Sequence, residues 1–300
     1  MEQGIEPYLK ESLTKEIIIR DLKALGVQEG DLLLVTCAMS EIGWVEGGTK
    51  TFLDAVLEIV GEQGGVLSYA FTPLYHLPLK PEDARLVFDR HSDPQAGSFV
   101  NLMMHHPNAI RSTHPSCSYL GIGKAIHKIL RNHKPSSFAY QPSLELTKVK
   151  NGKNLKVGTI QKMPGTVSIH PTQNILKLKN RTLGKYGVNY RDENGKIKLF
   201  KRDYVGGCSR GFGNFFTPYR EAGAVSEGQV GNAESMLLEL KRTIEIDKAI
   251  LGRDPGFFFC NDPFCHSCRV TWDFSPESPV YFKLKLHLSK LFPALTRFFR

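Results

Sequence analysis

The sequence lacks any uninterrupted apolar run of about 18 residues, the length that a membrane-spanning helix needs. Its first residues, MEQGIEPYLKESLTKE, are polar and acidic and lack the apolar stretch behind a basic start that marks a secretory signal. Both absences favour a cytoplasmic location. Internal repeats and linker-like segments are also missing, which favours one elaborated domain over a string of modules.

Cysteine is sparse, and the sequence has no secretory signal, so we expect reduced thiols and no disulfide framework. Only three of the cysteines cluster, in the segment Cys260-Asn-Asp-Pro-Phe-Cys265-His266-Ser-Cys268. Together with His266 they offer four ligands that suit zinc, although adjacent Cys265 and His266 could hardly bind one ion together. The alternative is a compact reduced turn packed on the Phe257–Phe259 run.

Acidic residues are scarce in the middle of the chain. Residues 101–220 carry 21 basic and 4 acidic residues, whereas residues 1–100 carry 8 and 16 and residues 221–300 carry 10 of each. A basic segment can indicate a nucleic-acid partner, but the sequence shows no recognition helix, aromatic RNA platform or finger spacing. We therefore expect no nucleic acid. At 41% hydrophobic and 23% charged residues, the chain is typical of a soluble globular protein.

The secondary-structure pattern predicts an α/β fold. A helix begins at Ser12 or Thr14 and stops at Gly26, and a buried strand follows at residues 31–35. The helix TFLDAVLEIVGEQGG and a strand at 66–71 complete a β-α-β unit. Such units are parallel, and sites gather at the carboxyl ends of their strands.

Later segments predict a strand at 154–160, a hairpin around ENGK within 177–210, and a helix from about Asn232 to Leu251. Residues 72–114 are loop-rich, and long irregular stretches in a compact domain are often binding loops. The basic apolar tail, FKLKLHLSKLFPALTRFFR, is expected to dock on its own domain. The alternative is peripheral contact with an anionic membrane.

Three segments carry residues suited to chemistry. The loop 36–49 follows a buried strand and contains three glycines, so its backbone could approach a phosphate, or it could be a plain turn. The segment Arg111-Ser-Thr-His-Pro-Ser116 offers a guanidinium, hydroxyls and an imidazole for an anion, or it is a surface turn. His170 precedes a proline at the end of an element and could be a general base or a structural histidine.

Taken together, these segments resemble the aminoglycoside 3-N-acetyltransferase family, whose members use acetyl-CoA and do not have the GNAT fold. The resemblance covers roughly residues 15–250. It begins with LGVQEGDLLLVTCAMSEIGWVEGGTKTFLDAVLEIVGEQGGVL and continues through AFT, FDRHSDPQAGSF, RSTHPSCSYLGIG and SIHPTQN to GAVSEGQVGNAES. It implies a three-layer α/β/α fold around a mixed, largely parallel sheet, in a domain spanning residues 1–255. Residues 256–300 then form a Cys-rich, basic extension.

The resemblance also implies site residues. His170 falls where the family has its histidine base, with Gln173 three residues later, and the acceptor amine attacks the thioester directly. The positions implied for acetyl-CoA are Thr36, Cys37, Ala38, Met39, Ser40, Gly43, Arg111, Ser112 and His114.

This chain departs from the family pattern at two places. It has Thr36-Cys37-Ala38 where the family usually has His-Ser-Ser, and Gln173 where the family has glutamate. Glutamate would raise the basicity of the histidine or attract a cationic amine, which Gln173 hardly does.

The basic middle segment would partly suit a polyphosphorylated cosubstrate and would repel a polycationic drug. The expected acceptor is therefore a neutral or anionic amino sugar, such as a sugar nucleotide or glycan precursor. A different possibility is a family member that binds CoA or a glycan without catalysing a reaction. The oligomeric state cannot be read from the sequence.

Overall fold

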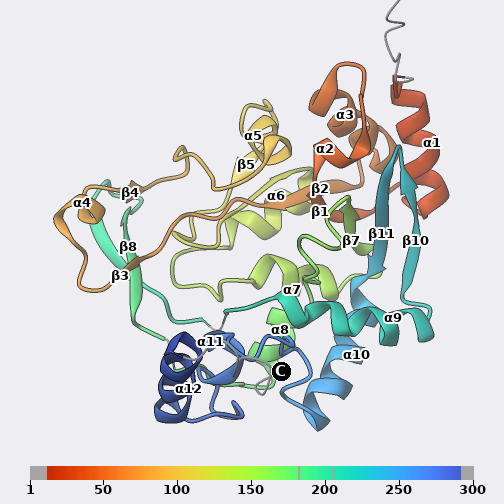
Figure 1. Cartoon of the computed structure of the whole chain (residues 1–300). Helices are drawn as coiled ribbons and strands as arrows, with labels where there is room; N and C mark the ends of the chain where they lie inside the picture. Colours follow the sequence, from red (N-terminus) through yellow and green to blue (C-terminus); the bar gives the residue numbers. More distant parts are fainter. Residues whose placement is uncertain (1–11, 182, 205, 292–300) are drawn as a thin grey trace, which may run out of the picture.

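A seven-stranded sheet forms the centre of the computed structural model, which describes residues 12–181, 183–204 and 206–291 (Figure 1). The strand order is β10-β11-β7-β1-β2-β6-β5. The strands are β1 (Leu32–Cys37), β2 (Gly65–Tyr69), β5 (Ile110–Arg111), β6 (Tyr119–Ile122), β7 (Gly152–Val157), β10 (Val225–Val230) and β11 (Ala233–Glu239).

Strand β1 pairs in parallel with β2 and with β7, and the other neighbours in this sheet are antiparallel. The mixed sheet and the α/β class are as predicted. The prediction that most strand pairs in this sheet are parallel is wrong, because β6 and β11 both run antiparallel to the central strands. Only the central three-stranded part follows the β-α-β pattern that the sequence indicated.

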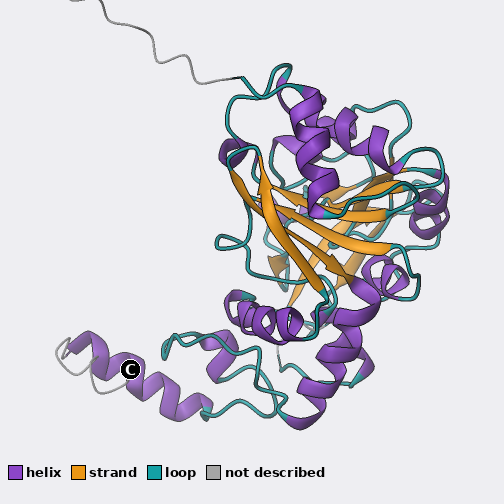
Figure 2. Cartoon of the chain, turned by 90° about the vertical axis from the view of Figure 1, so that its right-hand side faces the viewer, coloured by secondary structure: helices purple, strands orange, loops and turns teal. Residues whose placement is uncertain are grey.

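Helices cover both faces of the sheet and give the predicted three layers (Figure 2). One face packs on α1 (Lys15–Leu25), α3 (Gly48–Val60) and α5 (Ser98–Met104), and the other on α6 (Lys124–Arg131), α7 (Gln141–Thr147) and α10 (Leu240–Arg253). The other helical segments are α2 (Met39–Ile42), α4 (Pro81–Ala84), α8 (Ile169–Ile175), η1 (Arg210–Phe215), α9 (Phe216–Glu221), α11 (His266–Arg269) and α12 (Pro279–Leu291).

The first helix forms as its sequence predicts. The Thr14 hydroxyl accepts a hydrogen bond from the Ile17 backbone N–H, at 3.5 Å, and caps the N-terminus. Gly26 ends the helix in the left-handed conformation, with φ 106°, which glycine adopts without strain. The face with Ile18 and Leu22 is fully buried and anchors α1 to the sheet.

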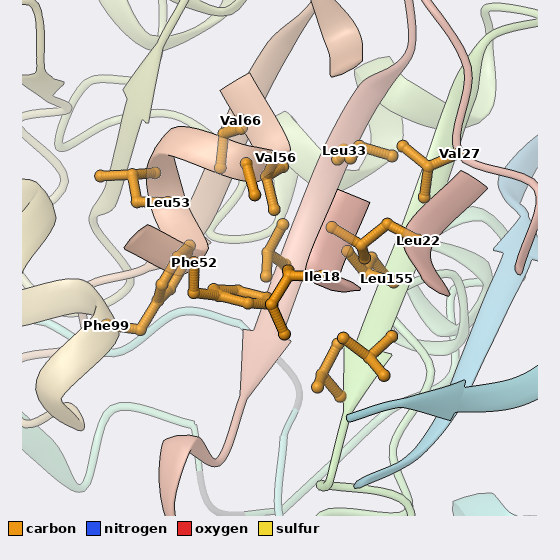
Figure 3. Close-up of a cluster of buried hydrophobic side chains, with 14 of the residues drawn as sticks. Ile18, Leu22, Val27, Leu33, Phe52, Leu53, Val56, Val66, Phe99 and Leu155 are labelled. Atoms are coloured by element: carbon orange, nitrogen blue, oxygen red, sulfur yellow. The ribbon is translucent and has the colours of Figure 1, made fainter. Parts of the chain in front are cut away.

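The core on this face is built from aliphatic side chains of α1, α3 and the central strands around an aromatic pair (Figure 3). Phe52 and Phe99 meet edge to face, with ring centroids 5.6 Å apart. Phe52 is fully buried. Burying an aromatic side chain of this size contributes about 1.5–3 kcal/mol by area alone, so this pair fixes α3 and α5 on the sheet.

The helix predicted from Asn232 to Leu251 is only partly right. Its first half, Ala233–Glu239, is strand β11, which lies between β10 and β7. Met236 and Leu237 are buried on opposite faces of the sheet, in different core clusters. The apolar run in this segment therefore reflects a strand that is covered on both faces, not the buried face of a helix. The helix begins at Leu240.

A second, smaller sheet projects away from the main one (Figure 1). Its hairpin, β8 (Tyr186–Arg191) with β9 (Ile197–Lys201), confirms the hairpin predicted around ENGK. The sheet also takes in β3 (Tyr75–His76) and β4 (Val87–Phe88), two short strands from the loop-rich stretch 72–114.

The boundary predicted at residue 255 stays a prediction. Phe258 and Trp272, which follow it, pack with Phe212 in one buried cluster. In the tail, Phe282 of α12 is buried, whereas residues 292–300, with Pro293, lie outside the described residues. Across the described ranges, no helix has the length and apolar character needed to span a membrane.

Candidate active site

The segments that carry the predicted site residues leave the main sheet at one edge. Strands β1, β2 and β7 are mutually parallel, so their carboxyl ends meet there. Strand β6 starts at the same edge and β5 ends there, because each is antiparallel to its neighbour. The loop after β1, the segment 111–118 and the loop from β7 to α8 therefore converge. In α/β sheets this edge is where ligands bind.

His170 lies near the start of α8 and is held by Gln173 one turn later. Its Nδ1 donates to the Gln173 Oε1 at 2.8 Å, and the Gln173 side chain is fully buried. With the proton on Nδ1, the other ring nitrogen, Nε2, carries a lone pair. Among the described residues, no group hydrogen-bonds to Nε2. The ring is therefore oriented with a proton acceptor available.

Burial lowers the pKa of His170 to about 4. The hydrogen bond that His170 donates to Gln173 opposes this shift, and the positive charge of Arg202 adds to it. The imidazole is therefore neutral at pH 7, as a general base must be. A histidine that acted as an imidazolium cation and stabilised a negative charge would need a raised pKa instead.

Aromatic rings enclose the histidine. Tyr140 stacks on it with centroids 4.3 Å apart and an interplanar angle of 18°, and Phe212 meets it edge on at 5.1 Å. Tyr204 packs on Tyr140, and the Arg202 guanidinium lies over the Tyr204 ring at 5.1 Å. Sequence reasoning missed these four residues, since they come from segments far apart in the chain with no motif to mark them.

The end of β1 and the start of α2 bring the predicted Thr36, Cys37, Ala38 and Met39 to this edge half-buried, with Ser40 exposed. Thr36 Oγ1 lies 3.2 Å from Thr159 Oγ1, which ties the end of β1 to the segment that leads into α8. Burial raises the pKa of the Cys37 thiol to about 12, so Cys37 is not a thiolate at neutral pH.

Gly43 is required by the backbone of this loop. Its φ of 105° lies in the region that favours glycine, and a Cβ there would be 2.7 Å from Asn232 Nδ2. The backbone at Gly43 therefore lies close to the turn between β10 and β11 of the protein itself.

Arg111, predicted to hold an anion, is buried and bound to the protein. Its guanidinium donates to Ser118 Oγ at 3.0 Å, to the Ala70 carbonyl at 2.9 Å, to Thr72 Oγ1 at 3.4 Å and to the Ser92 carbonyl. Most of its five N–H donors are therefore already used. Arg111 therefore fixes the strand ends and has few donors left for a phosphate, and its role in anion binding stays a prediction.

The predicted Ser112 and His114 are also engaged internally. Ser112 Oγ accepts from the Tyr119 backbone N–H at 2.9 Å and lies 3.0 Å from His133 Nδ1. His114 Nδ1 accepts from the backbone N–H groups of Ser116 and Cys117, and its ring stacks on His133 at 4.9 Å. Burial lowers the pKa of His114 to about 3 and that of His133 to about 4, so both rings are neutral.

A basic cavity of about 1110 Å³ opens between the segment 110–113, the end of α6 and the small sheet. Its lining carries seven basic side chains and four acidic ones. The basic ones are Arg90, Arg111, Arg131, Lys134, Arg191, Lys198 and Lys201.

The structure brings three of the four predicted metal ligands together, and a different cysteine takes the place of the fourth. Cys260, Cys265 and Cys268 meet Cys208, with all four Sγ atoms within 4.8 Å of one another. His266 is not part of this group, and its ring packs on Phe282 at 5.5 Å. The prediction missed Cys208 because it lies more than fifty residues earlier in the chain.

The fold and the candidate site together define a three-layer α/β protein with a neutral histidine near the carboxyl ends of its parallel strands. A family model described as aminoglycoside 3-N-acetyltransferase matches residues 34–251. The chain therefore belongs to the aminoglycoside 3-N-acetyltransferase family, as its sequence segments indicated.

Two curated relatives illustrate the range of similarity. Aminoglycoside N(3)-acetyltransferase VIII of Streptomyces fradiae is 35% identical over 134 residues, which are 40% of this chain and 47% of that protein. Aminoglycoside N(3)-acetyltransferase III of Serratia marcescens is 26% identical over 81% of this chain and 98% of its own length. The match spans about half the length of the first two curated relatives.

The fold has close counterparts among solved structures. The structure described as AAC-IIIb binary with CoASH aligns with a TM-score of 0.69 and 21% identity, covering 81% of this chain and 97% of that one. The acceptor class in the relatives' names is the aminoglycoside. The expectation of a sugar nucleotide therefore finds no support in these comparisons.

Proposed function

We propose that this protein transfers the acetyl group of acetyl-CoA to an amine of an aminoglycoside-type amino sugar, with His170 as the general base. The names of its relatives support this reaction and acceptor class, and the CoASH in the AAC-IIIb structure supports the donor. The observation that carries the proposal is the hydrogen bond from His170 Nδ1 to Gln173, which leaves Nε2 as the proton acceptor.

The proposed step is a direct transfer. The amine nitrogen attacks the thioester carbonyl carbon as its proton moves to His170 Nε2, and a tetrahedral oxyanion forms. The oxyanion then collapses, the carbon–sulfur bond breaks, and the thiolate of CoA leaves and takes up a proton. The products are the amide and free CoA, and Gln173 keeps the imidazole oriented throughout.

A direct transfer agrees with the state of the cysteines nearest this edge. Burial raises the pKa of both the Cys37 and the Cys117 thiols, so neither supplies the thiolate that an acyl-enzyme would need. The acceptor amine is then the only nucleophile that the reaction requires.

We further propose that the donor enters at the edge shared by the loop after β1 and the basic cavity. The backbone of Thr36–Ser40 would follow the pantetheine arm, and the excess positive charge of the cavity would attract the phosphates. Arg131 at the end of α6 and Lys134 just after it line this cavity, as does Arg111, which is already bound to the protein. A double variant, Arg131→Gln with Lys134→Gln, should raise the KM for acetyl-CoA several-fold with kcat nearly unchanged. An unchanged KM would remove these residues from the donor site.

The reaction and acceptor class are tested by a panel of amines with acetyl-CoA. Thiol release measures turnover, and mass spectrometry of the product shows the added acetyl group. The panel should include aminoglycosides, a neutral amino sugar and an amino-sugar nucleotide. Turnover highest with aminoglycosides supports the proposal, whereas turnover confined to the nucleotide would contradict the acceptor class. CoA binding without turnover on any amine would identify a non-catalytic binding protein.

A further inference from the structure

Four cysteine thiols from two distant parts of the chain meet in one cluster. Cys208 precedes η1, whereas Cys260, Cys265 and Cys268 follow the aromatic run at 257–259. Their four Sγ atoms all lie within 4.8 Å of one another, and three of the residues are buried. All four are free thiols. Nothing in the proposed acetyl transfer uses them, so the cluster needs its own explanation.

The arrangement matches the coordination preferred by a structural zinc ion. Zinc takes four thiolate ligands at about 2.3 Å in a tetrahedron, which places the sulfurs about 3.8 Å from one another. Four sulfurs within 4.8 Å surround one point at that scale. A disulfide would bring only two sulfurs together, to about 2.05 Å, and would give no reason for the four to converge.

The backbone around the sulfurs has the form of a metal-binding knuckle. Cys265 and Cys268 are separated by two residues, and a turn closes between them through a hydrogen bond from the Cys268 N–H to the Cys265 carbonyl at 3.1 Å. The Cys260 N–H points at Cys268 Sγ, 3.4 Å away. Backbone N–H groups aimed at sulfur stabilise the thiolate form that a metal requires.

Two arginines supply positive charge around this group, where four thiolates and one zinc ion would carry a net charge of −2. Arg210 Nε donates to Cys208 Sγ at 3.5 Å, and its Nη2 pairs with Asp262 at 2.9 Å. Arg269 donates to the Cys260 carbonyl at 2.9 Å and to the Asp262 carbonyl at 3.2 Å. These contacts orient the ligand loops, and the two guanidinium groups offset part of the negative charge, to which the Asp262 carboxylate adds.

The four-cysteine cluster links the C-terminal segment to the aromatic side chains that pack around His170, the proposed base. Two residues beyond Arg210, Phe212 packs edge on His170 at 5.1 Å and on Phe258 at 6.0 Å. A metal that joins Cys208 to the 260–268 loop would fix both ends of this aromatic layer. We infer that Cys208, Cys260, Cys265 and Cys268 bind one zinc ion that fastens the C-terminal segment against the active site.

Metal content of the full-length protein, purified without chelators and with reduced thiols, tests this site. We expect about one zinc per chain by mass spectrometry of the elements. We also expect cobalt substitution to give the visible absorption bands of tetrahedral thiolate coordination. Absence of both signals in folded wild-type protein would overturn the inference, as would an iron content in place of zinc or two disulfides among the four cysteines.

Two variants separate this ligand set from the one that the sequence alone predicted. Cys208→Ser should lose most of the bound zinc, whereas His266→Gln should keep it, because His266 lies against Phe282. A chelator should lower the thermal midpoint of wild type and His266→Gln but leave metal-free Cys208→Ser unchanged. The opposite order, with zinc lost only in His266→Gln, would contradict the four-cysteine site. The wild-type cobalt spectrum decides the question if Cys208→Ser does not fold.

Discussion

Replacing Gln173 with glutamate introduces a negative charge beside His170, the proposed base, and leaves the size of the side chain at position 173 nearly unchanged. Gln173 Oε1 lies 2.8 Å from His170 Nδ1, so a glutamate in the same rotamer would place a carboxylate against the ring. The carboxylate favours the imidazolium form, which the neutral amide favours far less. Gln173→Glu should therefore raise the pKa of His170.

The size of the shift follows from the geometry. A negative charge at this range raises a histidine pKa by about 1–3 units, or about 1.4–4 kcal/mol at 1.36 kcal/mol per unit. Arg202 opposes the effect, and the existing hydrogen bond already supplies part of it. Starting from a pKa of about 4, we expect an increase of about two units. The second carboxylate oxygen would take the place of the buried Gln173 Nε2, which has no hydrogen-bond partner among the described residues. This replacement should cost about 1–3 kcal/mol of stability.

The assay is a pH titration of the ¹³Cε1 resonance of His170, identified by its loss in His170→Asn. Gln173→Met is the matched control, since it fills a similar volume with neither charge nor hydrogen bond and should keep the pKa low. Equal pKa values in Gln173→Glu and Gln173→Met would refute the reasoning. So would a wild-type His170 that titrates near its ordinary value of about 6.5.

Three further outcomes follow from the same structure. Arg202→Met should raise the pKa of His170, because this cation lowers it, and Arg202→Lys should not; the same resonance reports both. His114 and His133 have pKa values well below the unfolded value of 6.5, so the unfolded chain binds more protons as pH falls from 6.5 towards 4. The contribution of the pair to the free energy of unfolding should therefore fall by about 5 kcal/mol between pH 8 and pH 4.5, measured in urea as the difference between wild type and a variant with both His114→Phe and His133→Phe. The same pH dependence in the two proteins would contradict this. Phe52→Ala should cost about 3–5 kcal/mol in the same assay and Phe52→Leu clearly less, and equal costs would argue against a tightly packed core.

Local signals in the sequence predict local structure well. Thr14 and Gly26 cap the first helix as expected, and the turn around ENGK closes a hairpin. In both cases the determining contacts lie within a few residues, where cap and turn chemistry dominates. The β-α-β core follows from the same kind of pattern.

Strand pairing between distant segments explains where the secondary-structure predictions failed. Ala233–Glu239 has an apolar run that suits either a helix or a central strand, and its two strand neighbours decide the outcome. The short strands at Tyr75–His76 and Val87–Phe88 have no pattern of their own, because they form only against β8, about a hundred residues away.

The site was predictable where one segment carries it. His170 and Gln173 sit one turn apart on α8, so their spacing alone places them in contact. Arg111 was predicted to bind an anion from its residue type, and this stays a prediction, but its hydrogen bonds to the Ala70 and Ser92 carbonyls come from the fold alone. Cys208 shows the same limit, since only the fold brings it to the other three thiols.

The central claim is that His170 accepts the proton of the attacking amine. Its most direct test is kcat with the best aminoglycoside acceptor for wild type and His170→Ala, with CoA affinity measured on both proteins. The account predicts a loss in kcat of about 10²–10⁴-fold with CoA affinity retained, since general base catalysis contributes about that factor. A His170→Ala protein with wild-type kcat would contradict the account.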